Sequence, residues 1–463
     1  MGSEFKPIQQ CKENPHYFMW RGKPTILLTS AEHYSAVFNR AFDNRKYLDT
    51  LKTCGFNHTR LYTGVKRETP GLFNIAGNPQ APELKDFICP WKRTSTPGAA
   101  DGGNKFDLDS WDEEYFDRLR QYFTDAGERG VEIEFALFSA HHIRSSGYGL
   151  WNICPMNNNN NINNVGEIEG LEFHSLKHPK IVEYQDKMIR KLVQELNGFD
   201  NFHFEICNEP YHDLITLEWH QHIADLIANE EAKLPNQHMI SINMFNGFIE
   251  IQKPLNHIDI YNFHYMQRET VDRNYRLGKI IGMNETGIEV RRETYEYQAW
   301  EIIFAGAALY NMLDYSYTVG CEDGTFELPP SQPGGGSPEL RKRLGILSKF
   351  INSFEFEKMS PHNEVVKEAM LQNGRFHVLA EIGKQYGIYA KSMQHSGGVG
   401  RMRLGVEIPA GTYKLEVMET ENGNVVINET RRHEGGLMRM TMDNSTKVEH
   451  NLDHAFAVSI KAV

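Results

Sequence analysis

Eight short apolar runs, most of them followed by a segment with helical periodicity, constrain the fold of this chain more than any other feature. We predict strands at residues 25–30, 58–62, 131–138, 202–207, 239–244, 258–263, 279–283 and 310–315. Strands that alternate with helices pair in parallel, because each helix carries the chain back to the same edge of the sheet. Eight repeats within about 330 residues favour a closed (β/α)8 TIM barrel over an open sheet.

The pattern changes near residue 354, where short strands follow one another without helices. We predict them at residues 376–381, 386–390, 401–406, 411–418, 424–428, 437–442 and 455–460. A spacing near ten residues is typical of an antiparallel β-sandwich. The predicted domains are therefore a barrel with an N-terminal hairpin at 6–353 and an accessory sandwich at 354–463. No Trp follows Trp300, which favours a packing role for the sandwich over carbohydrate binding.

Composition excludes some classes of partner. The chain has 463 residues and a net charge of −12, which would repel a nucleic-acid backbone or an anionic membrane. We also expect no membrane span, because no run of about 18 apolar residues occurs. The six cysteines are scattered without a C-x-x-C pair, so neither a zinc site nor a disulfide framework is expected. A secreted or periplasmic location is a weaker expectation, with the signal peptide absent from the chain as given.

Two predicted connections are unusually long. Residues 64–110 and 139–178 each follow a strand, on the side of a barrel where active sites lie. The second contains the tract 157–164, which is almost entirely Asn. It is typical of a mobile polar loop, and binding of sugar hydroxyls is the alternative.

Two glutamates end predicted strands. Residues 202–210 read FHFEICNEP and residues 280–287 read IIGMNETG. Alternation along the first strand turns Glu209 toward the barrel axis, and Glu285 ends the other strand. Retaining cleavage of a glycosidic bond uses one carboxyl group that protonates the leaving oxygen and another, about 5–5.5 Å away, that attacks the anomeric carbon. The pair is therefore a candidate for this chemistry, without a cofactor or a metal.

Asn208-Glu209-Pro210 after strand 4, joined to Glu285 after strand 7, resembles the clan A glycoside hydrolases, of which family 5 is the best-known member. The resemblance covers about residues 14–352. It implies that Glu209 is the acid/base, that Glu285 is the nucleophile and that Asn208 binds the 2-hydroxyl of the cleaved sugar. The implied partner is a carbohydrate with a β-linkage.

The resemblance implies further ligands on other strands. Arg60 matches an Arg of strand 2, and its parity turns it inward, where it can hold the nucleophile ionised. A His is expected after strand 3, and parity favours His142 over His141. At strand 6, His264 and Tyr265 match a His/Tyr position, with Tyr265 pointing inward.

The chain departs from family 5 at strand 8, where the usual Trp is missing. Tyr315 or Tyr317 is the expected replacement. At the end of strand 1, Glu32 and His33 are candidate sugar ligands.

Aromatic side chains in the two long connections are candidates for outer sugar subsites. Trp91 lies in the first connection and Trp151 in the second. Indole faces stack on sugar rings, so we predict that both bind substrate.

The sequence leaves three readings open. A retaining hydrolase acting by double displacement is the leading one. A transglycosylase would use the same residues, and a catalytically silent sugar-binding barrel is a further alternative. Sugar identity, exo or endo action and oligomeric state are not predicted.

Overall fold

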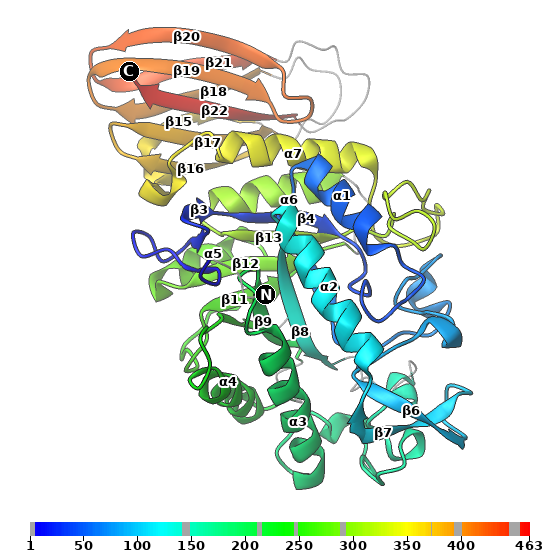
Figure 1. Cartoon of the computed structure of the whole chain (residues 1–463). Coiled ribbons are helices and arrows are strands. Elements are labelled where there is room, and N and C mark those ends of the chain that lie inside the picture. The colour runs from blue at the N-terminus through cyan, green and yellow to red at the C-terminus, as the bar shows by residue number, and fades with distance from the viewer. Residues whose placement is uncertain are drawn as a thin grey trace.

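A computed structural model describes residues 5–140, 149–210, 215–244, 249–287, 293–371, 373–392, 401–443 and 454–463. A barrel of parallel strands with helices outside it forms the larger part, and a layered antiparallel sandwich lies beyond α6 and α7 (Figure 1). None of the helices in the described part of the chain is both long and apolar enough to span a membrane. The predicted fold class is confirmed.

Eight parallel strands form the barrel sheet, in the order β4-β13-β12-β11-β10-β9-β8-β5. They are β4 (Leu27–Ala31), β5 (His58–Tyr62), β8 (Glu132–Ser139), β9 (Phe202–Asn208), β10 (Ile240–Asn243), β11 (Ile260–His264), β12 (Ile280–Glu285) and β13 (Leu309–Leu313). The two end strands meet through Asn57. Its side-chain oxygen accepts from Leu28 N at 2.9 Å, and its amide donates to Ile26 O at 2.9 Å. Asn57 N also donates to Leu28 O at 3.4 Å, and Tyr62 N donates to Tyr34 O at 3.0 Å at the other end of the seam between β4 and β5.

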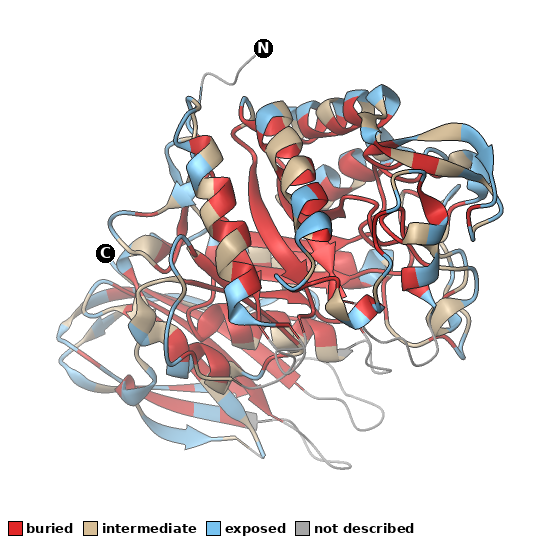
Figure 2. Ribbon diagram, turned by 90° about the horizontal axis from the view of Figure 1, so that it is seen from below, coloured by how far each residue is buried: buried red, intermediate tan, exposed pale blue. Residues whose placement is uncertain are grey.

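The helices follow the strands and cover the outside of the barrel. They are α1 (Asn44–Cys54), α2 (Glu113–Arg129), α3 (Pro179–Leu196), α4 (Leu217–Glu231), α5 (Arg268–Asn274), α6 (Glu293–Phe304) and α7 (Pro338–Ile351). Gly55 and Gly130 end α1 and α2 in the left-handed conformation, because glycine adopts it without a steric cost. Figure 2 shows buried strands inside helices whose outer sides are exposed.

The lower half of the barrel interior is polar rather than apolar. His58 Nδ1 and His203 Nδ1 each lie 2.7 Å from an oxygen of Glu132. Above them, Glu134 accepts from Asn262 Nδ2 at 2.5 Å and Asn284 Nδ2 at 3.1 Å. All these groups are buried. Both carboxylates have hydrogen-bond partners on neighbouring strands, which offsets the cost of burying them.

The His203 ion pair predicts a pH dependence of stability. Burial lowers the pKa of His203, but Glu132 and Glu134 outweigh burial and raise it to about 10. A raised histidine pKa stabilises the fold below the unfolded pKa, near 6.5, and this contribution disappears as the pH rises through about 10. Urea unfolding should therefore show His203→Gln less stable than the wild type at pH 6, with a gap that narrows by pH 10. A gap independent of pH would contradict the pairing.

The first long connection contains regular structure that the sequence did not reveal. An antiparallel hairpin, β6 (Trp91–Pro97) and β7 (Asn104–Trp111), lies within the segment that we expected to be irregular. Two register shifts interrupt the pairing. They disrupt the regular alternation by which a strand is recognised in sequence.

The Asn tract forms a loop that is held by hydrogen bonds. It packs against the hairpin, where Ile162 N donates to Phe106 O at 2.9 Å and Leu108 N to Asn163 Oδ1 at 2.7 Å. Asn161 is buried. Its amide donates to the carbonyls of Asn157 and Val165 at 2.8 and 2.9 Å, and its oxygen accepts from Val165 N at 3.1 Å.

Replacing Asn161 by Ala should destabilise the protein by about 2–3 kcal/mol, because buried backbone groups lose their partners. Thermal unfolding of Asn161→Ala measures this loss. Asn159→Ala is the control, because Asn159 lies in the same tract and its side chain is exposed. Equal melting temperatures for the two variants would argue against a structural role of Asn161.

The C-terminal part consists of two antiparallel sheets. One contains β14 (Ser360–Pro361), β16 (Arg375–Glu381), β17 (Gln385–Ser392), β22 (His454–Ala462), β19 (Gly411–Glu419) and β20 (Val425–His433). The other contains β15 (Val366–Met370), β18 (Arg401–Ile408) and β21 (Gly436–Asp443). Apolar side chains from both sheets form one core, as in a sandwich.

The sandwich packs against the barrel through aromatic rings. Trp300 of α6 is stacked on Tyr389 of β17, with ring centroids 5.6 Å apart. A small hairpin of β2 (Phe18–Trp20) and β3 (Lys23–Thr25), extended by β1 (Gln9–Gln10), precedes the barrel. We propose that the barrel and the sandwich are separate domains that meet between residues 353 and 354.

Candidate active site

Three residues at the barrel mouth have left-handed backbone conformations. They are Tyr34, Glu209 and Tyr265, with φ of 57°, 47° and 51°. Such conformations cost energy in non-glycine residues and persist only where the surroundings hold them. The backbone N–H of Glu209 donates to Asn243 Oδ1 at 2.9 Å, and that of Tyr265 to Glu285 O at 3.2 Å. Neighbouring strand ends thus stabilise the turns that aim these side chains.

The two predicted catalytic glutamates face one another. Glu209 follows β9, and Glu285 is the last residue of β12. One oxygen of each and a ring nitrogen of His264 all lie within 4.8 Å of one another. This is shorter than the separation of about 6.5–9.5 Å that leaves room for a water between two carboxyl groups. Both carboxylates can reach the same atom of a bound molecule.

Arg60 holds several of the polar groups beneath this pair. Its Nη1 donates to Glu285 Oε2 at 3.1 Å and its Nη2 to Asn208 Oδ1 at 2.8 Å. The guanidinium also forms a bidentate pair with Glu205, with Nε to Oε2 at 2.9 Å and Nη2 to Oε1 at 2.6 Å. The side chain is completely buried. Its positive charge beside Glu285 also disfavours a metal cation at the same place.

His264 lies between the two carboxylates. Its Nδ1 is 3.1 Å from Glu209 Oε1 and 3.5 Å from Glu285 Oε1. Burial lowers the pKa of His264, but the charges of Glu285 and Glu209 outweigh it, and the pKa is raised. A protonated imidazole would bridge both carboxylates.

Tyr265 completes the environment of Glu285. Its hydroxyl donates to Glu285 Oε1 at 3.2 Å. Burial and the nearby charges of Glu285 and Glu209 raise the pKa of Tyr265 well above its ordinary value, so the hydroxyl remains a donor. Each oxygen of Glu285 therefore has its own donor, Arg60 on one side and Tyr265 on the other, and the two bonds orient the carboxylate.

Glu205 belongs to this site although the sequence did not single it out. Alternation along β9 turns Glu205 to the same inner face as Glu209, but an inward-facing carboxylate does not by itself indicate a function. Burial and the neighbouring Glu134 raise the pKa of Glu205 to about 7, against the opposing effect of Arg60. Its bidentate pair with the guanidinium orients Arg60.

Two of the predicted sugar ligands at the ends of strands 1 and 8 lie next to one another. The rings of His33 and Tyr315 meet edge to face at 5.4 Å. Tyr317, the alternative to Tyr315, lies completely buried beside α1, with its ring against that of Tyr47 at 4.9 Å. Of the two tyrosines, Tyr315 is therefore the one near the site.

The prediction for Glu32 is corrected. Its carboxylate accepts from Ser35 N at 2.6 Å, Ala36 N at 3.1 Å and Ser35 Oγ at 3.0 Å. The side chain is completely buried, so it organises its own loop and has no oxygen directed to a ligand. A short polar residue three positions after a carboxylate was the available sequence signal for such a cap.

The predictions for the two tryptophans are corrected as well. Trp91 is 1% exposed and belongs to the apolar core. Trp151 is 7% exposed, packs on Phe173 at 5.1 Å and donates to Ile168 O at 3.0 Å. Neither indole presents an exposed face, because the described parts of the two long connections pack around both rings. The predicted position His142, with its alternative His141, lies outside the described residues.

A buried polar cluster beside the site was not foreseen. It consists of His33, Lys66, Glu68, Asn78 and Gln80. Lys66 Nζ donates to Glu68 Oε1 and Gln80 Oε1, both at 2.6 Å, and Asn78 Nδ2 donates to Glu68 Oε2 at 2.6 Å. His33 Nδ1 lies 3.1 Å from Asn78 Oδ1. Four of these residues lie in the first long connection, and its fold brings them against His33 at the end of strand 1.

Comparison with known proteins identifies the fold. No protein-family model matches the sequence, and no curated protein matches it. A family 5 glycoside hydrolase from Bacteroides vulgatus ATCC 8482 has a similar structure, with a TM-score of 0.63 at 12% identity, over 98% of this chain and 93% of that one. This chain has the fold of that glycoside hydrolase. Another structure described as a glycoside hydrolase matches with a TM-score of 0.63 at 12% identity, over 98% of this chain and 96% of its own.

Proposed function

We propose that this chain is a retaining glycoside hydrolase that cleaves a β-linked carbohydrate. The observation that carries the proposal is the facing pair of Glu209 and Glu285, with Arg60 and Tyr265 each donating to Glu285. Its fold is also that of glycoside hydrolases.

The proposed reaction has two displacements. Glu285 attacks the anomeric carbon while Glu209 gives its proton to the glycosidic oxygen, so the C–O bond to the leaving group breaks as the bond to Glu285 forms. A water then attacks the same carbon, gives its proton to Glu209 and releases Glu285. Two inversions restore the original configuration. Asn208, held by Arg60, is positioned to meet the 2-hydroxyl of the sugar.

The charges around the pair are consistent with Glu285 as the nucleophile and Glu209 as the acid/base. Arg60 and Tyr265 stabilise negative charge on Glu285. Two carboxylates this close are costly to ionise together, which favours a proton on Glu209. A protonated His264 would donate to the carboxylate that remains when the proton leaves Glu209.

Product stereochemistry tests the proposal. The protein is incubated with a panel of aryl β-glycosides and the first-formed sugar is followed by ¹H NMR. We expect the β-anomer first, followed by slow mutarotation. First formation of the α-anomer would contradict the retaining mechanism. Absence of turnover on every glycoside would instead support a sugar-binding barrel.

A further inference from the structure

Three loops at the barrel mouth are bonded into one continuous structure. They follow β13, β4 and β5 and span residues 314–337, 32–43 and 63–90; we call them the loop wall. Asn74 Nδ2 donates to Ser331 O at 3.2 Å, and Ala76 N donates to Gln332 Oε1 at 2.8 Å. These two bonds join the loop after β5 to the loop after β13.

The loop after β4 is joined to the loop after β5 in the same way. Asn39 Nδ2 donates to Pro79 O at 2.8 Å, and Ile88 N to Phe38 O at 3.0 Å. The three loops come from strands that are adjacent around the barrel. The wall therefore occupies one side of the barrel mouth, and hydrogen bonds join each of its loops to the next.

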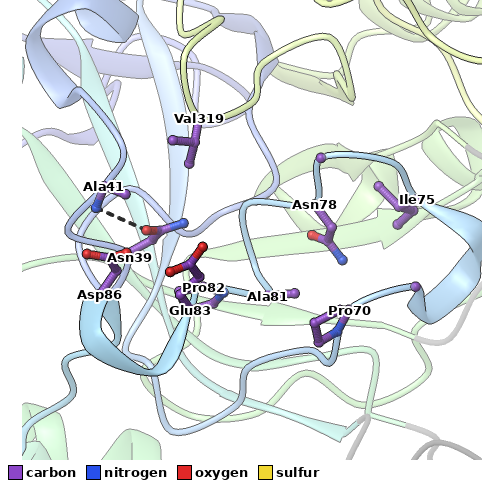
Figure 3. A pocket seen from close by; sticks show the side chains of 12 residues that line it. Asn39, Ala41, Pro70, Ile75, Asn78, Ala81, Pro82, Glu83, Asp86 and Val319 are labelled. Atoms are coloured by element: carbon purple, nitrogen blue, oxygen red, sulfur yellow. Dashed lines mark hydrogen bonds between the residues drawn. The ribbon is translucent and has the colours of Figure 1, made fainter.

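A pocket of about 320 Å³ lies between the loops of the wall. Figure 3 shows Asn39 and Ala41 on one side of it, Ile75 and Asn78 on the other, and Val319 above. Asn78 lines this pocket and its Oδ1 also lies 3.1 Å from His33 Nδ1. Asn78 and His33 thus separate the pocket from the catalytic residues.

The inner side of the wall carries the buried polar cluster and lies next to the nucleophile. Burial, Glu285 and Glu68 all raise the pKa of Tyr315, which places its hydroxyl within the influence of both carboxylates. Tyr315 in turn contacts His33. The cluster is buried, with Lys66, Glu68 and Gln80 at 3%, 1% and 0% exposure. Packed side chains therefore stand on this side of Glu285, where a second sugar would otherwise continue.

The position of the wall relative to the acid determines which part of a substrate it faces. Going around the barrel from β4, which lies at the middle of the wall, β10 is the opposite strand and β9 is its neighbour. Glu209, after β9, must contact the oxygen of the leaving group. The leaving group therefore lies on the β9 side, and the sugar that is attacked points its far end toward the wall.

We propose that the loop wall closes the non-reducing side of the cleft, so that this enzyme removes single sugars from the non-reducing ends of its substrates. This inference rests on the proposed hydrolase function. It adds that the site beyond the attacked sugar is blocked, and that His33, which the buried polar cluster holds in place, meets a hydroxyl of a terminal residue.

Oligosaccharides labelled at the reducing end test this directly. β-1,4-Linked pentasaccharides of glucose and of mannose carry a fluorophore on the reducing end, and early products of the wild-type protein are separated by chromatography. We expect a free monosaccharide and a labelled tetrasaccharide before any shorter labelled species. Early labelled di- and trisaccharides would overturn the inference while leaving the hydrolase function intact. No turnover of these or of any aryl glycoside would overturn both.

A variant of the wall gives a second test. In the wild type, 4-nitrophenyl β-disaccharides should release 4-nitrophenol directly much more slowly than the corresponding monosaccharides. The double variant Asn74→Ala/Gln332→Ala removes the bonds between two loops and should raise the disaccharide-to-monosaccharide ratio of kcat/KM about tenfold, equivalent to 1.4 kcal/mol. Gln237→Ala is the matched control, because its amide also bonds two carbonyls but lies before β10, at the opposite end of the barrel. A wild type that accepts both substrates equally, or an unchanged ratio in the double variant, would overturn the inference.

Discussion

Glu285→Ala should lose hydrolysis of aryl glycosides by a factor on the order of 10⁴ or more, because no other group can form the covalent intermediate. Sodium azide should restore turnover and give an α-glycosyl azide, since the anion enters the emptied space and attacks once, with inversion. NMR of the product identifies its configuration. Glu183→Ala, an exposed glutamate on α3, serves as the control and should keep full activity.

Azide also distinguishes the role of Glu209 from that of Glu285. Glu209→Ala should lose about 10²–10⁴-fold on a glycoside with a poor leaving group, and much less on a 2,4-dinitrophenyl glycoside, whose leaving group needs no proton. Azide should then give the β-glycosyl azide. If the α-product came from Glu209→Ala and the β-product from Glu285→Ala, the two roles would be reversed.

Arg60→Met should reduce the free energy of unfolding by about 3–5 kcal/mol, because it leaves buried carboxylates without their cation. Glu205, Glu285 and the nearby Glu134 all depend on Arg60. Urea unfolding at pH 7 measures the loss. Arg45→Met removes an exposed arginine of α1 that pairs with Asp125, and it should change stability by about 1 kcal/mol at most.

A double variant separates loss of the cation from loss of packing. Arg60→Met/Glu205→Gln removes the principal carboxylate partner along with the guanidinium, so it should recover part of the lost stability. If the double variant were destabilised by the sum of the two single changes, the stability would not depend on the pairing of Arg60 with Glu205.

The local rules of strand parity and strand ends predicted the barrel and the centre of its candidate site. Parity turned Arg60 and Tyr265 inward, and the structure has both beside Glu285. These predictions succeed because each depends on a few consecutive residues.

Predictions that depended on the path of a long loop failed. Trp91 was expected at a sugar subsite, but the hairpin that begins with it buries its ring. Glu32 was predicted to bind sugar, but the loop that follows it places the N–H groups of Ser35 and Ala36 against its carboxylate. The polar cluster around Lys66 depends on contacts between loops, and no local pattern marks such contacts. For the same reason the sequence did not predict which end of a substrate the site would accept.

The seam between β4 and β5 has a consequence for how this barrel moves. Elsewhere in the ring, neighbouring strands share a ladder of backbone bonds, whereas here Asn57 bonds across one end of the seam and Tyr62 N donates to Tyr34 O across the other. With few bonds across it, this seam should open more readily than a continuous ladder. Arg60 and the loop of His33 lie on opposite banks of this seam. Amide exchange should therefore be fastest between these two strands, and each opening would separate Arg60 and its bond to Glu285 from the loop wall that we propose to face the substrate.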